Sequence, residues 1–99
     1  MIYLDDKYKK IVLSILQKYP YTFYIYGSRV KGTQHRTSDI DICFTDPIPL
    51  SVQAHIEEDF EESDLPFQVD LSDFNLMSRS FQEKIKNEMY LLQQKTVSK

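Results

Sequence analysis

The sequence predicts an α/β (α+β) fold, a small mixed β-sheet flanked by helices within one domain. Two observations lead to this prediction. Apolar residues recur at helical spacing in three segments, and the short segments between them are rich in β-branched and aromatic residues. The chain has 99 residues, the size of a single domain, and its hydrophobic fraction of 41% is sufficient for one core. We expect this domain to span residues 1–92 and residues 93–99 to form a flexible tail.

The first half of the chain is expected to contain a helix followed by a strand that ends in a glycine turn. Apolar residues at helical spacing predict a helix over residues 5–18, which ends before Pro20. Residues 21–26 are apolar or aromatic on both alternating faces, which is typical of an interior strand. Residues 29–34 are expected to form a short helix or turn, and residues 34–38 a polar loop.

The second half is expected to contribute two more strands and two more helices. Apolar and polar residues alternate over residues 39–44, which predicts a strand that the proline-rich segment 46–49 terminates. Residues 51–63 are expected to be helical. Residues 66–72 alternate again and predict a third strand. A capping box at Ser80 and an apolar stripe predict a last helix over residues 80–92.

Charge and composition exclude several classes of protein. The net charge is −3, so no overall basic field attracts the chain to nucleic acid. The single cysteine, Cys43, excludes an intramolecular disulfide and fits a reducing cytosol. No segment approaches the roughly 20 apolar residues that a membrane helix needs. These observations predict a cytoplasmic protein without a membrane anchor and without nucleic acid as a direct partner.

A glycine-serine turn follows the first predicted strand. Both glycines of the chain lie in the segment from Gly27 to Gly32, where Ser28, Arg29 and Lys31 also lie. A tight turn of this kind offers backbone N–H groups and a hydroxyl to phosphate oxygens, and the two basic side chains can balance phosphate charge. The alternatives are an ordinary turn and solvated basic residues.

Three aspartates are candidates for metal binding. Asp39 and Asp41 are spaced so that a strand points both to one face, and carboxylate oxygens suit Mg²⁺. Asp70 points away from the apolar face of the third predicted strand. If that strand pairs with residues 39–44, Asp70 can join the metal pair and accept a proton from an attacking hydroxyl. The alternatives are carboxylates on a solvent-exposed edge strand, or Asp73 in the role of Asp70.

The motifs together resemble a known family. Gly27-Ser28, ten intervening residues and then Asp39-Ile40-Asp41 match the signature of the DNA polymerase β-like nucleotidyltransferase superfamily. The short length resembles the minimal nucleotidyltransferases (MNT) of bacteria and archaea. This resemblance implies that Gly27 and Ser28 hold the triphosphate, that Asp39, Asp41 and Asp70 bind two Mg²⁺ ions, and that ATP is a substrate. Lys31 stands where the family often has arginine, so it keeps the charge without the planar fork.

The resemblance also implies a function and a partner. Minimal nucleotidyltransferases are often the antitoxins of pairs with small helical HEPN proteins, and they transfer AMP to a tyrosine of the toxin. We therefore expect a Mg²⁺-dependent nucleotidyltransferase with a HEPN partner. Two rivals stay open: an antitoxin that binds nucleotide without turnover, and a small-molecule adenylyltransferase of the aminoglycoside type. The sequence leaves the base, the acceptor and the oligomeric state, including a homo-oligomer, undecided.

Overall fold

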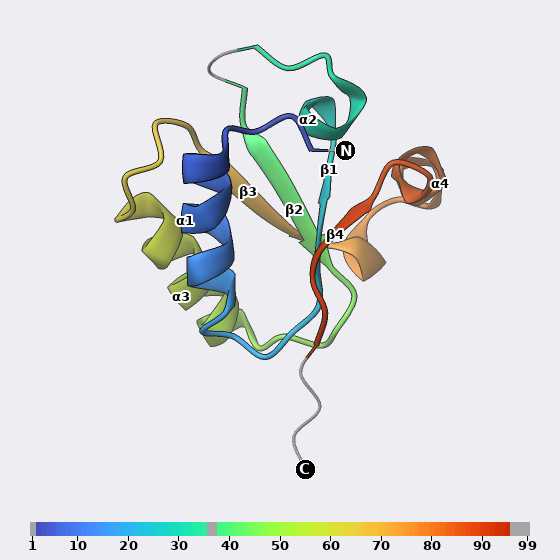
Figure 1. Ribbon diagram of the computed structural model, residues 1–99. Coiled ribbons are helices and arrows are strands. Elements are labelled where there is room, and N and C mark those ends of the chain that lie inside the picture. Colours follow the sequence, from blue (N-terminus) through green and yellow to red (C-terminus); the bar gives the residue numbers. More distant parts are fainter. Residues whose placement is uncertain (1, 36–37, 96–99) are drawn as a thin grey trace.

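A four-stranded β-sheet with helices on both faces forms the protein (Figure 1). The computed structural model describes residues 2–35 and 38–95. Its elements in chain order are α1 (Asp6–Leu16), β1 (Phe23–Tyr26), α2 (Ser28–Lys31), β2 (Ile40–Phe44), α3 (Leu50–Glu61), β3 (Val69–Asp73), the 3-10 helix η1 (Phe74–Leu76), α4 (Arg79–Lys86) and β4 (Tyr90–Gln93).

The sheet is mixed, as the sequence predicts. Its strand order is β3-β2-β1-β4; β1 runs antiparallel to both β2 and β4, whereas β2 and β3 are parallel. The parallel pair requires a crossover connection, and α3 supplies it. The expected interior strand is confirmed, because β1 lies between β2 and β4.

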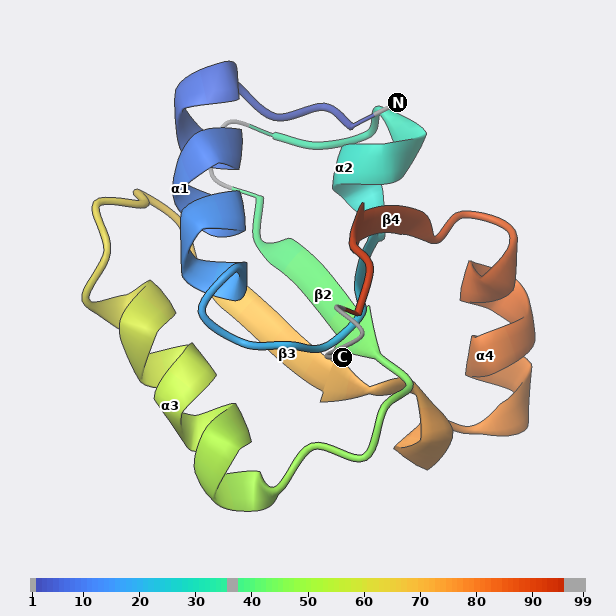
Figure 2. The same ribbon diagram turned by 60° about the horizontal axis from the view of Figure 1, so that its bottom comes forward.

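Each face of the sheet is covered by different helices (Figure 2). The main core lies under α1 and α3, where Leu16 and Ile56 pack against Ile40 and Ile42 of β2. On the opposite face a smaller cluster joins Ile85 of α4 to residues of β1 and β2. Since β2 contributes its even-numbered residues to the main core, its odd-numbered residues face the α4 side of the sheet.

Two predictions for the last helix, the capping box at Ser80 and the end at residue 92, are wrong. The helix begins after Ser78, whose hydroxyl accepts a hydrogen bond from the backbone N–H of Phe81, and it ends at Lys86. Residues 90–93 form β4, which the sequence did not predict. Met89 packs in the smaller cluster and Leu92 against the main core, so the two do not share one helical stripe.

Residue 93, the expected start of a flexible tail, belongs to a strand instead. Gln93 is the last residue of β4, and its side-chain amide donates to the carbonyls of Leu16, Tyr19 and Tyr21. The Leu16 and Tyr19 carbonyls also accept hydrogen bonds from the backbone N–H groups of Tyr19 and Tyr21, so the Gln93 amide adds a further donor and connects β4 to the segment between α1 and β1. Residues 96–99 lie outside the described part of the chain.

A polar contact joins the end of α1 to α3. The Tyr19 hydroxyl donates a hydrogen bond to the Asp59 carboxylate, and the Lys18 ammonium lies 3.0 Å from the same oxygen. The hydrogen bond from Tyr19 and the nearby Lys18 lower the pKa of Asp59. Burial, together with Asp59, raises the pKa of Tyr19 to about 12. Both shifts favour the pair of ionised Asp59 and protonated Tyr19.

We predict that Tyr19→Phe makes the free energy of unfolding depend less on pH in the acidic range. The folded pKa of Asp59 is below its unfolded value, so its contribution is present above about pH 4 and is lost as the pH falls. The variant should lose about 1 kcal/mol of unfolding free energy at pH 7 and less at pH 3. Urea denaturation at both pH values measures this, with Tyr21→Phe as control. Equal losses at both pH values would contradict the assignment.

Candidate functional site

Gly27 connects β1 to α2 in a conformation that favours glycine. Its φ is +88° and its ψ −154°, and a Cβ atom placed on it would lie 2.5 Å from Oδ2 of Asp41. Most side chains avoid this backbone region, and the space is filled by the carboxyl group. The backbone at Gly27 therefore passes directly beside Asp41.

Ser28 begins α2 immediately after this turn. The amide groups at the start of a helix have no intrahelical acceptor, so they are free for other ligands. Ser28 is half-buried, and its hydroxyl has no hydrogen-bond partner among residues 2–35 and 38–95. Because Gly27 fixes the position of α2 relative to Asp41, the serine lies close to the acidic part of the sheet.

The register of the sheet brings two of the predicted carboxylates together. Asp41 of β2 is paired with Asp70 of β3 and, on its other side, with Tyr26 of β1. Val69 and Leu71 pack against the main core, which leaves Asp70 on the opposite face with Asp41. Asp39 lies one residue before β2 and is exposed. Asp41 and Asp70 thus share the face of the sheet that α1 and α3 do not cover, and Asp39 lies at the N-terminal end of β2 beside them.

Burial and like charges change the ionisation of Asp41. Desolvation, followed by the charges of Asp70 and Asp39, raises the pKa of Asp41 to about 6. Desolvation also raises the pKa of Tyr26 to about 12, and the charges of Asp41 and Asp70 add to this shift. The site therefore holds negative charge that the described side chains do not compensate, and a bound cation would relieve it.

The three aspartates can supply only part of the coordination sphere of Mg²⁺. Within residues 2–35 and 38–95, no group of three or more His, Cys, Asp or Glu side chains is placed to hold a metal ion by itself. Mg²⁺ usually binds a few protein carboxylates and completes its octahedron with water and substrate phosphates. Asp39, Asp41 and Asp70 have the right chemistry for this partial role, beside the Gly27-Ser28 turn.

Arg29 and Lys31 are placed differently from the sequence expectation. The Arg29 side chain is buried, at 5% exposure, and donates to the backbone carbonyls of Ser38 and Tyr3. The Lys31 ammonium lies 3.5 Å from the carboxylate of Glu88. Neither cation is directed at the aspartates by a contact in the described structure. The partners Tyr3 and Glu88 are far away in sequence, and no local pattern signals them.

Two further residues near the aspartates have other structural roles. Asp73 ends β3, where it is paired with Phe44, and its carboxylate accepts a hydrogen bond from the backbone N–H of Asn75. It lies three positions along the strand from Asp70, so Asp70 is the residue beside Asp41. Cys43 is fully buried, and desolvation raises the pKa of its thiol to about 12. Cys43 is thus a small buried residue without thiolate chemistry.

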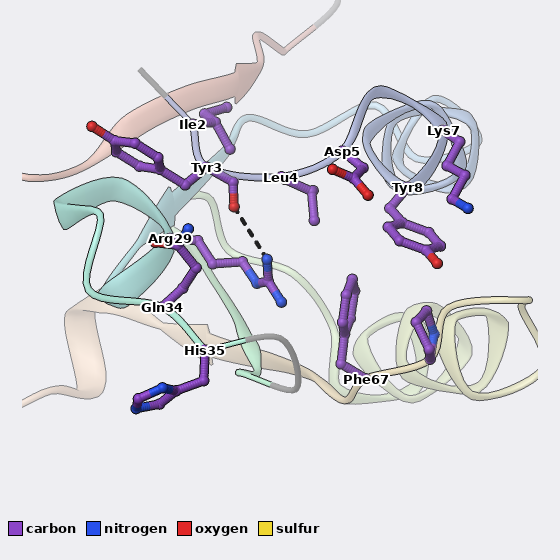
Figure 3. Close-up of a pocket in the computed structure, with 11 residues that line it drawn as sticks. Ile2, Tyr3, Leu4, Asp5, Lys7, Tyr8, Arg29, Gln34, His35 and Phe67 are labelled. Carbon is purple, nitrogen blue, oxygen red and sulfur yellow. Dashed lines mark hydrogen bonds between the residues drawn. The ribbon is translucent and has the colours of Figure 1, made fainter.

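Two open cavities flank the loop that leads into β3. One has a volume of about 740 Å³ and includes Asp39 and Asp70 in its lining. The other, of about 870 Å³, lies beside Arg29 and the start of α1 (Figure 3). Pro66 and Phe67 line both. Of these two cavities, only the smaller one has any of the three aspartates in its lining, and Asp41, Gly27 and Ser28 do not line it. We therefore place the candidate site at the edge where this cavity meets the face of the sheet that carries Asp41.

The fold and the site define a nucleotidyltransferase: the chain belongs to the family described as "Polymerase beta, Nucleotidyltransferase", which matches residues 9–96. It is 41% identical over 89 residues to a "Probable protein adenylyltransferase MntA" from Haemophilus influenzae, covering 86% of this chain and 78% of that relative.

Two solved structures are similar in fold. A "toxin-antitoxin with AMP-PNP" has a TM-score of 0.67 and 25% identity, covering 87% of this chain and 73% of that one. A mutant of the toxin-antitoxin MntA-HpeT has a TM-score of 0.60 and 16% identity, covering 87% and 72%. In the part of the chain that the structure describes, no helix is long and apolar enough to span a membrane.

Gly27→Ala should disrupt the site. The added methyl group meets Asp41 and a backbone conformation that alanine avoids, so we expect a loss of about 1–3 kcal/mol of stability. We also expect at least tenfold weaker binding of ATP, the substrate that the sequence resemblance implies, by calorimetry. Gly32→Ala is the control, because its φ is +81° and its Cβ would meet the Tyr3 ring instead. Equal effects of the two variants on ATP binding would contradict this prediction.

Asp41→Asn should stabilise the protein in the absence of divalent cations. The folded pKa of about 6 exceeds the unfolded value, so wild-type stability falls as the pH rises from about 4 to 6. The variant lacks this loss, so at pH 7.5 it should be more stable than wild type by about 1–2 kcal/mol, a figure that is reduced because Asp41 is partly exposed to solvent. At pH 4 the two proteins should be equally stable. Thermal unfolding in EDTA measures this, and Asp64→Asn controls for net charge. A variant less stable at pH 7.5 would contradict it.

Proposed function

We propose that this chain is a Mg²⁺-dependent protein adenylyltransferase that transfers AMP from ATP to a tyrosine hydroxyl of a small helical HEPN toxin, and so acts as its antitoxin. The observation that carries the proposal is the pairing of Asp41 with Asp70 directly beside the Gly27 backbone. This arrangement joins a metal-binding pair to a phosphate-binding turn. The similarity to a probable protein adenylyltransferase supports AMP as the transferred group.

Each residue has a role in this proposal. The backbone of Gly27 and the hydroxyl of Ser28 bind the β- and γ-phosphates. Asp39, Asp41 and Asp70 hold Mg²⁺, which, when bound, neutralises charge on the reacting phosphate and on the leaving pyrophosphate. Asp70 is exposed, so it can also accept the proton of the acceptor hydroxyl. The new bond joins the hydroxyl oxygen to the α-phosphorus, and the bond from that phosphorus to the β-phosphate bridge breaks.

The open site favours an acceptor on another molecule. Asp39 and Asp70 are exposed, and the cavity beside them lies between α3 and the start of β3. A macromolecular hydroxyl can reach such a surface without a closed pocket around it. A structure of a toxin-antitoxin with AMP-PNP has the same fold, which supports a toxin as the acceptor.

The combined variant Asp39→Asn/Asp41→Asn should abolish transfer. We expect label transfer from α-labelled ATP to the proposed partner, the product of the neighbouring gene, to fall at least about a hundredfold, because carboxylate-held metal supplies several kcal/mol. The exposed double variant Glu62→Gln/Asp64→Asn removes the same charge at two residues that do not line the cavity and leaves the three aspartates intact, so it should retain activity.

The same assay separates the rivals. Toxin neutralisation that survives the double Asp→Asn change would favour an antitoxin that acts by contact. Label on an aminoglycoside, and none on the HEPN protein, would favour a small-molecule adenylyltransferase. Replacement of the labelled tyrosine of the partner by phenylalanine should remove the label if the proposed acceptor is correct.

A further inference from the structure

Arg29 is a buried cation without a carboxylate partner. Its exposure is 5%, and within residues 2–35 and 38–95 no Asp or Glu oxygen lies within ion-pair distance of its guanidinium. Burial lowers its pKa, although the charge of Asp5 acts in the opposite direction. The guanidinium lies over the Phe67 ring, 4.4 Å from its centroid, at the edge of the larger cavity (Figure 3). A buried charge is costly unless its donors are used.

The donors of Arg29 bind two backbone carbonyls from different parts of the chain. Nε and Nη2 donate to the carbonyl of Ser38 at 3.2 and 2.9 Å, and Nη1 donates to the carbonyl of Tyr3 at 3.1 Å. In return, the backbone N–H of Tyr3 donates to the carbonyl of Arg29 at 2.7 Å. The planar guanidinium can satisfy both carbonyls at once, which a lysine ammonium on a flexible stem does less well.

The Ser38 carbonyl belongs to the peptide group that carries the N–H of Asp39. A peptide group is planar, so a fixed Ser38 carbonyl fixes the orientation of the Asp39 backbone. On the other side, the N–H of Ile40 donates to the carbonyl of Gln68 at 2.9 Å. Asp39 is outside β2, and these two contacts take the place of strand pairing for its backbone.

We propose that Arg29 is a positioning residue that sets the place of Asp39, and through it the affinity of the site for Mg²⁺, rather than a ligand of the triphosphate. The inference rests on the proposed function only in that Asp39 and Asp41 bind the metal. Hydrogen bonds that orient metal-binding side chains typically change metal affinity by about 10–100-fold when they are removed. Arg29 acts one peptide group further away, through the backbone.

Metal binding by the full chain tests this role directly. Mn²⁺ is titrated as a paramagnetic probe for Mg²⁺ into wild type, Arg29→Gln and Arg29→Lys, and free Mn²⁺ is followed by electron paramagnetic resonance. Both variants should bind Mn²⁺ about tenfold more weakly or worse. Lys7→Gln is the matched control, because Lys7 lines the same cavity and carries the same charge. It should bind Mn²⁺ like wild type.

Nucleotide binding without metal distinguishes positioning from phosphate contact. In EDTA, the affinity for ATP should stay within about twofold of wild type in both Arg29 variants, since the proposed role acts through the metal. Weaker ATP binding in Arg29→Gln, restored in Arg29→Lys, would overturn the proposal in favour of a charge contact with phosphate. Lower thermal stability with unchanged Mn²⁺ affinity would also overturn it, because the role would then be structural only.

A milder variant covers the case in which both Arg29 variants fail to fold. Phe67→Leu removes the ring that supports the guanidinium, so the guanidinium should hold the two carbonyls less firmly while the chain still folds. It should weaken Mn²⁺ binding in the same direction, and unchanged binding in this folded variant would overturn the proposal. The proposed function fails in a different way. If Mn²⁺ binding depends on Arg29 as expected but the wild-type protein transfers no AMP, only the proposed function is contradicted.

Discussion

The register of β2 within the sheet determines both the core and the candidate site. Its even-numbered residues, Ile40 and Ile42, are fully buried under α1 and α3, whereas Asp41 lies on the other face between Tyr26 and Asp70. A slip of one residue would exchange the two faces, burying a carboxylate in the main core. The same hydrophobic force that fixes the strand therefore fixes the acidic pair.

The site is held in a conformation that is costly without a ligand. Asp41 is partly desolvated, repelled by two other carboxylates, and in contact with a backbone that only glycine can easily form. Interactions of this kind reduce stability and cluster at functional sites, where bound charge compensates them. The unusual backbone at Gly27 and the unusual ionisation of Asp41 are two aspects of one close approach.

The two basic residues of the glycine-serine segment make contacts that the sequence motif does not predict. The sequence predicts that Arg29 and Lys31 balance phosphate charge, because both lie within three residues of Ser28. In the structure, Arg29 joins the N-terminal segment to Ser38, and Lys31 pairs with Glu88 near β4. Both partners come from segments distant in the sequence. Proximity along the chain therefore does not identify the contacts that these two side chains make.

The sequence by itself determined the α/β fold, the glycine-serine turn and the strand that carries Asp41, because local periodicity and turn chemistry specify these features. It did not determine β4, since residues 90–93 become a strand only by pairing with β1, and their apolar pattern also fits a helix. Tertiary structure alone decided that Asp70 lies beside Asp41 and that Arg29 is buried. Strand pairing and burial depend on contacts between distant segments, which local sequence does not encode.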